Sequence, residues 1–505
     1  MSQRKPLILF VLSIFLIVMS SWTRWYFSGS LRADKNYIEN NDVAIFFYMV
    51  FYMSGFLLLT YTYYQVIFRK ENFNLSHDET QRLAYIGSVV AFFMTILFSS
   101  DIYTYLAEGE LATRGIFTYT DGSQMAQSTF IDYVSHWWQN CPNHYGPPLL
   151  FIFFISVFLG KTVFFSYVVF KFLLLVVALL FVKTIGAVLK QQNTPTQYNL
   201  FALVVLSPLF FIEGAGQVHV DLVISLLLAL FVYFFLQNKI MASVVIMSVT
   251  IACKLMYGMV LLPLLLALFF VKYINIEKNI KAFLLTSFAS IFLLLVVVGL
   301  VYIPVWNGWE TITTPIKFHE TKIAARSFSE LFILINKFGG ELISNGFNIQ
   351  QVLAKAADAS FFPLSEVLEK QAKFVPIFKL LGLLLGAWNI LPLIRATNIH
   401  QVFHAFARLW IIVITVYSPI FNPWYFLPVL VFLMFTDKKT WMLYAVIVIS
   451  QSINGQLGTS TITPDSIWMV FASVQVIVLV PLFLLFFSKH LITEPYKELT
   501  QNNNP

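Results

Sequence analysis

The chain has 505 residues, of which 58% are hydrophobic and only 11% charged, and its mean hydropathy is +0.76. A soluble protein has about 25% charged residues, so this composition excludes the soluble globular classes and indicates a polytopic membrane protein. The formal net charge of +7 comes from scattered lysines and arginines rather than a dense patch, which excludes a nucleic-acid partner. The two cysteines, Cys141 and Cys253, predict no disulfide framework.

The apolar runs predict an all-α transmembrane bundle of about 14 spans, with 12 to 14 allowed, forming one domain over residues 1–505. The first run is expected to be an uncleaved span, because Trp22, Arg24 and Trp25 follow it instead of a small-residue cleavage site. The predicted spans are 7–26, 43–67, 83–100, 163–188, 198–212, 219–237, 240–253, 256–272, 282–305, 374–394, 403–421, 424–436, 441–454 and 466–488.

Charge predicts the orientation of these spans, since basic residues are concentrated in cytoplasmic loops. Both termini are expected in the cytoplasm, which places the following basic residues on one side: Arg4, Lys5, Arg69, Lys70, Arg82, Lys190, Lys278, Lys281, Arg395, Lys438 and Lys439. The apolar segment 147–160 is long enough for only about 21 Å as a helix. We therefore expect it to be interfacial or re-entrant, because a full span there would reverse every later loop.

Two large loops then lie on the outer face, the first over residues 101–160 and the second over residues 305–374. Residues 354–373 have helical periodicity, and we expect both loops to fold over the membrane surface as amphipathic helices.

Unusual polar residues are predicted on this same outer face. Asp101 ends the third predicted span, and Lys254 interrupts an apolar hairpin. The others are Glu213, His219 and Asp221 between two spans, His319, Lys322 and Arg326 in the second loop, and Asn422, Trp424 and Tyr425 between two later spans.

Each residue also has a purely structural interpretation. Asp101 could cap the helix that follows it, and Glu213 and Asp221 could be solvated loop residues. Lys254 could extend its amine to the membrane surface, and Trp424 with Tyr425 could belong to an interfacial aromatic belt. What favours a functional interpretation is that acids, an isolated lysine and a basic loop share one face.

This set of residues suits a phosphate-activated sugar carried on a lipid. A carboxylate can accept the proton of an attacking hydroxyl, and lysine or arginine can stabilise charge on a departing phosphate. Aromatic rings can stack on sugars and line a groove for an isoprenoid tail. The sequence has no Walker-type loop, which argues against a cytoplasmic nucleotide donor.

Four short blocks resemble the GT-C-type membrane glycosyltransferases and are most similar to the bacterial polyprenol-phosphate-mannose-dependent mannosyltransferases. They are Asp101-Ile102-Tyr103-Thr104-Tyr105-Leu106-Ala107-Glu108-Gly109 with Arg114-Gly115 downstream, His144-Tyr145-Gly146-Pro147-Pro148-Leu149-Leu150, Gly216-Gln217-Val218-His219-Val220-Asp221, and Asn422-Pro423-Trp424-Tyr425. This chain departs from the family pattern in two ways. Val220 separates His219 from Asp221 where relatives often have a Gly-His-Asn-Asp-like block, and two spans precede the one ending at Asp101.

The resemblance implies an inverting transfer of one sugar, mannose, from a polyprenyl-phosphate donor to a glycan, glycolipid or protein on the extracytoplasmic face of a bacterial inner membrane. It implies Asp101 as the catalytic base and Asp221 in a second acidic motif near the donor. The expected donor and phosphate site comprises Lys254, Lys322, Arg326, Asp221, His219 and Glu213. The expected substrate pocket comprises Tyr103, Glu108, His144, Tyr145, Asn422, Trp424 and Tyr425.

Asp101, Glu213, His219 and Asp221 could also ligate a hard divalent cation, but we expect no metal or other cofactor, because a monophosphate donor has fewer charges to neutralise. Two other functions stay open. One is a transporter or flippase for lipid-linked sugars, which usually has paired repeats that this sequence lacks. The other is an oligosaccharide ligase or polymerase with a larger donor.

Overall fold

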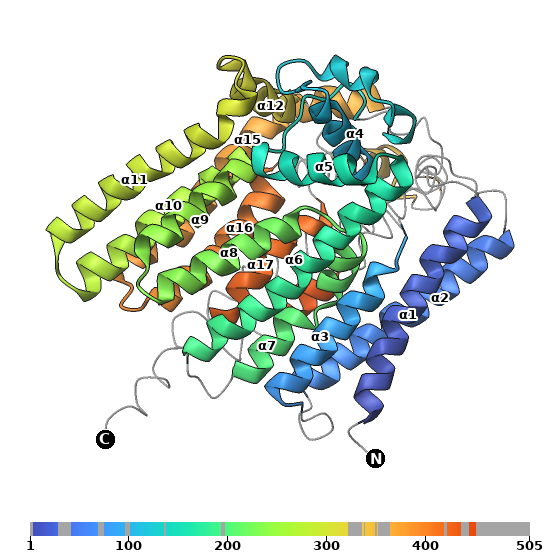
Figure 1. The fold of residues 1–505 in the computed structure, drawn as a ribbon, viewed down its shortest axis with the longest axis horizontal. Helices are drawn as coiled ribbons and strands as arrows, with labels where there is room; N and C mark the ends of the chain where they lie inside the picture. Colours follow the sequence, from blue (N-terminus) through green and yellow to red (C-terminus); the bar gives the residue numbers. More distant parts are fainter. Residues whose placement is uncertain are drawn as a thin grey trace.

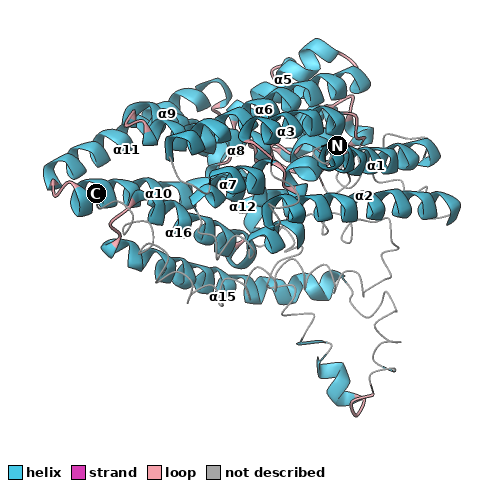
Figure 2. Ribbon diagram, turned by 90° about the horizontal axis from the view of Figure 1, so that it is seen from below, coloured by secondary structure: helices cyan, strands magenta, loops and turns pink. Residues whose placement is uncertain are grey.

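The structure is a computed structural model that describes residues 4–28, 42–68, 75–95, 101–135, 138–192, 197–321, 336–337, 339–348, 351, 364–418, 422–435 and 444–450. Within these ranges the regular elements are all helices and no strand is present (Figure 2). The predicted all-α bundle is therefore confirmed.

The N-terminal half of the bundle is built around a helix hairpin and one long helix. The first two helices pack side by side along their length (Figure 1), and the 30-residue α6 packs against α3, α5 and α8. The elements are α1 (Arg4–Ser28), α2 (Asp42–Phe68), α3 (His77–Phe92), α4 (Asp101–Thr113), η1 (Gly122–Gln127), η2 (Ile131–Tyr133), α5 (Pro147–Gly160), α6 (Val163–Gln192), α7 (Gln197–Val205) and η3 (Phe210–Gly216).

The C-terminal half of the bundle consists of helix pairs with short or broken ends, and α15 packs along α16 and η9 at one edge (Figure 2). The elements are α8 (Asp221–Leu236), α9 (Ile240–Cys253), η4 (Leu255–Tyr257), α10 (Gly258–Phe269), η5 (Phe270–Ile276), α11 (Ile280–Tyr302), η6 (Ile303–Val305), α12 (Glu310–Thr321), α15 (Leu364–Ile390), η8 (Leu391–Arg395), α16 (Ile399–Ile412), η9 (Val413–Tyr417), η10 (Pro423–Phe426), α17 (Leu427–Phe432) and η11 (Leu433–Phe435).

Seven described helices are long and apolar enough to cross a membrane, and the count becomes eight if the bent pair of η3 and α8 is one span. The outer side of α11 illustrates the need for a hydrocarbon environment, because Leu285, Phe288 and Phe292 are 66%, 74% and 62% exposed. The predicted span 466–488 and half of 441–454 lie outside the described residues, so the exact number of spans stays a prediction.

The predicted loop helices gather at one end of the bundle. In Figure 1, α4, α5 and α12 lie at the end opposite to the start of α1. Helix α4 crosses α5 so closely that a Cβ atom on Gly109 would lie 2.4 Å from the carbonyl oxygen of Phe153. The first predicted loop is thus an ordered layer, and its helix α5 contains the 14 residues of the segment predicted to be interfacial or re-entrant.

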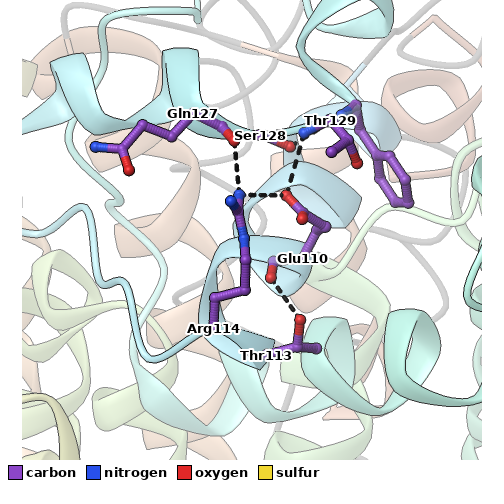
Figure 3. A network of polar contacts seen from close by, with 7 residues as sticks. Glu110, Thr113, Arg114, Gln127, Ser128 and Thr129 are labelled. Carbon is purple, nitrogen blue, oxygen red and sulfur yellow. Dashed lines mark hydrogen bonds and ion pairs between the residues drawn. The ribbon is translucent and has the colours of Figure 1, made fainter.

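An ion-pair network fastens the chain that follows α4 back onto this helix (Figure 3). Arg114 donates 2.9 Å to Glu110 and 2.6 Å to the carbonyl oxygen of Gln127, and Glu110 also accepts from the backbone N–H of Thr129. These bonds hold the η1 segment over the C-terminal turn of α4.

The third predicted span, residues 83–100, differs from the observed helix. Helix α3 begins earlier, at His77 after a Ser76–Glu79 capping box, and ends at Phe92. Asp101 is the first residue of α4 rather than the last residue of a span. The reason is tertiary: the carbonyl oxygens of Met94 and Thr95 are taken by the side chains of Lys171 and Gln217, so the chain leaves the helix there.

Candidate active site

Lys254 occupies a break between two helices, as the sequence predicts. Helix α9 ends at Cys253, Lys254 is extended with φ −156° and ψ 95°, and η4 starts at Leu255. This single extended residue turns the lysine side chain into the protein, where only 1% of its surface is exposed. It also frees the carbonyl oxygen of Cys253, which accepts a 2.8 Å hydrogen bond from the N–H of Gly146.

The ammonium group of Lys254 is surrounded by aromatic rings rather than by acids. Its Nζ atom lies 4.2 Å from the ring centre of Tyr425, 4.9 Å from that of Tyr257 and 5.7 Å from that of Tyr145. Among the described residues no carboxylate lies within ion-pair distance of it. Cation–π contacts stabilise the charge, but they leave it able to bind an anion.

Asp221 is linked to Lys254 through one tyrosine hydroxyl. The hydroxyl of Tyr257 donates to Asp221 Oδ1 at 2.5 Å and lies 3.4 Å from Lys254 Nζ. Asp221 is fully buried and is the first residue of α8, where the helix dipole favours a negative charge. The preceding element η3 meets α8 at an angle of 106°, so the acid lies at a sharp bend.

The negative charges of Asp101 and Asp221 influence the same two tyrosines, Tyr105 and Tyr145. The hydroxyls of Tyr105 and Tyr145 lie 3.3 Å apart. Burial raises the pKa of both tyrosines well above 10, and the negative charges of Asp101 and Asp221 raise it further. Two carboxylates that are 120 residues apart in the sequence therefore both lie close enough to influence one tyrosine pair electrostatically.

Glu213 and His219 form a second buried group beside this cluster. Glu213 Oε2 lies 3.3 Å from His219 Nε2, without hydrogen-bond geometry, and the His219 ring stacks on Trp424 with centroids 3.7 Å apart. Neither residue lines the cleft described below. Trp424 is next to Tyr425, so this packing positions one of the rings around Lys254.

Of the remaining predicted pocket residues, one lines the cleft and the others do not. His144 lines the cleft, with its ring centre 4.1 Å from that of Tyr145, and Asn422 Nδ2 lies 3.5 Å from the Tyr425 hydroxyl. Tyr103 is buried with its ring 5.4 Å from Tyr133. Glu108 is buried away from the cleft, and the Thr118 hydroxyl lies 2.7 Å from both of its carboxyl oxygens.

Three basic residues predicted in the second loop cannot be placed. Lys322 and Arg326 lie outside the described residues, and His319 belongs to α12 without a described side chain.

A cleft opens from Lys254 between the C-terminal helices. It has about 1050 Å³ of empty space, counted to its open mouth, and its walls come from α10, α12, α15, α16 and η9. Apolar side chains such as Met259, Ile316 and Ile414 line much of it, and its polar lining includes Lys254, Lys379, Tyr257 and Tyr425. The arrangement can hold an amphiphile with an anionic group at one end.

Three residues that were not predicted as site residues organise this region: Tyr105, Tyr257 and Lys171. The Tyr257 hydroxyl donates to Asp221, and the Tyr105 hydroxyl lies 3.3 Å from that of Tyr145. Tyr105 stands in the first family block, whereas no pattern in the sequence distinguishes Tyr257 from other tyrosines. Lys171 had a visible signal, because it interrupts the predicted apolar span 163–188. Its buried ammonium donates to the carbonyl oxygens of Met94 and Gly216.

In the described part of the chain, no group of three or more His, Cys, Asp or Glu side chains is placed to hold a metal ion. Asp101, Glu213, His219 and Asp221 therefore do not form one described ligand set, and metal independence stays a prediction.

Comparison with known proteins identifies a family. Residues 10–271, just over half of the chain, match the family model described as "Alpha-(1->6)-mannopyranosyltransferase, N-terminal domain". Similar proteins include two named alpha-(1->6)-mannopyranosyltransferase A: one from Mycobacterium tuberculosis, 27% identical over 166 residues, and one from Corynebacterium glutamicum, 25% identical over 175 residues.

These alignments cover 33% and 34% of this chain, and 32% and 36% of the two relatives, so the chain matches about a third of each relative's length. The family model is the more extensive match, and it includes Asp101, Tyr145, Asp221 and Lys254. With these residues gathered at one end of an apolar helical bundle, the chain belongs to the alpha-(1->6)-mannopyranosyltransferase family.

Proposed function

We propose that this protein is an integral membrane mannosyltransferase that uses a polyprenyl-phosphate mannose donor on the extracytoplasmic face of the membrane. The observation that carries the proposal is the buried ammonium of Lys254, which has aromatic neighbours, no described acid partner and an open apolar cleft beside it. A phosphate at this position would pair with the ammonium, while the isoprenoid chain would occupy the apolar walls.

The proposed reaction needs one base and one anion-stabilising group. Asp101 accepts the proton of an acceptor hydroxyl, whose oxygen then attacks C1 of the mannose. The bond between C1 and the phosphate oxygen breaks, and polyprenyl phosphate leaves with the electron pair, its charge stabilised by Lys254. The configuration at C1 inverts, so a β-linked donor would give the α linkage that the relatives' names carry.

Asp221 has a supporting role in this scheme. Its carboxylate accepts from Tyr257, whose hydroxyl also contacts Lys254. The acid thereby holds Tyr257 in place and adds negative charge near the lysine without direct contact. Glu213, His219 and Trp424 position Tyr425, and no metal ion is required by any of these steps.

The test is transfer of labelled mannose from polyprenyl-phosphate mannose to a mannoside acceptor by the purified protein in lipid nanodiscs. Asp101→Asn should reduce kcat by at least 10²-fold with little change in the KM for the donor. Lys254→Met should raise the donor KM and lower kcat, and Lys254→Arg should recover part of both because it restores the charge.

Matched controls are available for both variants. Asp121→Asn changes an exposed acid that caps η1 in the same outer loop, and Lys272→Met changes a lysine paired with Glu277 far along α10 and η5. Both should retain wild-type turnover. Wild-type activity in Asp101→Asn would show that another group is the base, and an unchanged donor KM in Lys254→Met would remove the phosphate site.

One observation favours a second function, a flippase for lipid-linked sugars. The 106° break between η3 and α8 places buried Glu213, His219 and Asp221 at a discontinuous helix, a feature common in transporters. Proteoliposomes separate the two functions: a flippase moves the intact donor across the bilayer without an acceptor, whereas the transferase consumes it only when acceptor is present.

A further inference from the structure

Asn143 lies in the wall of the cleft, next to His144 and Tyr119. Only 3% of its surface is exposed. The residue belongs to the loop between η2 and α5, and its backbone N–H donates 3.4 Å to the carbonyl oxygen of Thr118. Its backbone is therefore tied to the segment that follows α4.

The two ends of the Asn143 side chain have different surroundings. Oδ1 accepts a 2.9 Å hydrogen bond from the backbone N–H of Tyr145, two residues on, which makes an Asx turn. Nδ2 is buried and has no hydrogen-bond partner within the described residues. The turn thus uses the oxygen and leaves the amide nitrogen unpaired.

The unpaired nitrogen is informative because the turn does not need it. Asp makes the same turn through its oxygen, and Ser makes a similar one. A buried donor without a partner destabilises a fold, so Asn is a costly choice at this position unless something in the cleft accepts from Nδ2. A neutral amide suits a neutral oxygen, and the cleft already supplies Lys254 for an anion.

Resting on the proposed function, we infer that Asn143 is a specificity-determining residue whose Nδ2 donates a hydrogen bond to a hydroxyl oxygen of a pyranose bound in the cleft. The sugar would lie beside the ring of His144, which itself lies 5.6 Å from the ring of Trp138. These aromatic faces offer a stacking surface for the apolar side of a sugar. The hydroxyl belongs either to the donor mannose or to the acceptor sugar, and both have the same chemistry.

The experiment compares wild type with Asn143→Ser in nanodiscs, using complete sugars and sets of monodeoxy donors and monodeoxy acceptors. Ser keeps an oxygen for the Tyr145 N–H but is too short to replace Nδ2. With complete sugars we expect kcat/KM to fall roughly 3- to 10-fold. The deoxy analogue that lacks the recognised hydroxyl should be transferred equally well by both proteins, and its identity shows whether donor or acceptor is read.

A matched control and a second variant keep the assignment falsifiable. Asn140→Ser changes an exposed residue of the same loop and should behave as wild type. If Asn143→Ser unfolds at a lower temperature, Asn143→Asp, which keeps the whole Asx turn, replaces it in the comparison.

An equal loss for every analogue would mean that Asn143 acts only through the turn and would overturn the inference. Unchanged kinetics would overturn it as well. A wild-type protein that transfers no mannose from any donor would instead refute the proposed function itself.

Discussion

Glu108 belongs to a family motif, but its carboxyl group does not line the cleft and instead lies 2.7 Å from the Thr118 hydroxyl. Burial raises the pKa of its carboxyl group from 4.5 to about 8, although the hydrogen bond from Thr118 acts in the opposite direction. At neutral pH the folded protein therefore holds a proton that the unfolded chain releases. Stability must fall as the pH rises through the interval between these two values.

Replacing Glu108 by Gln should remove this pH dependence, because the amide keeps a bond to Thr118 and never ionises. The wild-type free energy of unfolding should decline from about pH 4.5 to 8, by up to about 1.4 kcal/mol per pH unit. Thermal unfolding in detergent between pH 5 and 9 measures the difference. Glu310→Gln, at an exposed position of α12, should keep the wild-type slope, and an equally steep slope in Glu108→Gln would contradict the assignment.

Asp101, Asp221 and Lys254 could be predicted as site residues from the sequence, because charged residues are rare in apolar runs. Tyr257 links Asp221 to Lys254 and no pattern in the sequence distinguishes it, whereas Tyr145 was predicted in the pocket from the family block that contains it. Glu108 was predicted in the pocket from its place in a motif, yet in the structure the chain that follows α4 brings Thr118 against its carboxyl group.

Lys171 holds the ends of two helical segments together next to the site. Its ammonium lies between the carbonyl ends of α3 and η3, where two partial negative charges meet. Gln217 adds a 3.1 Å bond to the carbonyl oxygen of Thr95. The bend that carries Glu213 and Asp221 is thus fastened to the end of α3.

Lys171→Met should destabilise the protein, because two buried carbonyl oxygens lose their donor at about 1–3 kcal/mol each. Lys183→Met changes an exposed lysine of the same helix and should have no such effect. The midpoints of thermal unfolding of the two variants in one detergent make the comparison. Equal midpoints would mean that the contacts of Lys171 contribute nothing measurable.

Helix boundaries were predicted best where a residue at the boundary itself interrupts the apolar run. The extended Lys254 separates two apolar runs, and the observed helices end and begin within a residue of the predicted spans 240–253 and 256–272. The end of α3 could not be predicted, since apolar residues continue past Phe92 and only Lys171 and Gln217, far away in the sequence, divert the chain.

The layer of α4, α5 and α12 beside the candidate site and the N-terminal end of α1 lie at opposite ends of the molecule (Figure 1). The predicted orientation, with cytoplasmic basic loops and an extracytoplasmic site, requires the two to be at opposite ends, and which end is cytoplasmic stays a prediction. The positive-inside pattern alone supplied that prediction, but the packing of α4 and α5 into an ordered layer is a tertiary property that hydropathy does not contain.

Labelling of single cysteines tests the orientation. In a background with Cys141 and Cys253 replaced by Ser, Ala126→Cys in η1 should react with a membrane-impermeant maleimide in intact cells. Lys239→Cys, between α8 and α9, should react only after the membrane is opened. The reverse pattern would invert the whole topology and place the site in the cytoplasm.

The hydrogen bond from the N–H of Gly146 to the carbonyl oxygen of Cys253 has a consequence for the proposed lipid donor. A Cβ atom on Gly146 would lie 1.6 Å from the carbonyl oxygen of Ala252, so the loop before α5 and the end of α9 are in direct backbone contact. This contact ties Tyr145 to Lys254 through adjacent backbone segments. A lipid donor of the proposed kind would therefore enter from the side of the cleft that α12 and α15 line, and it would meet Tyr145 and Lys254 already held at a fixed spacing.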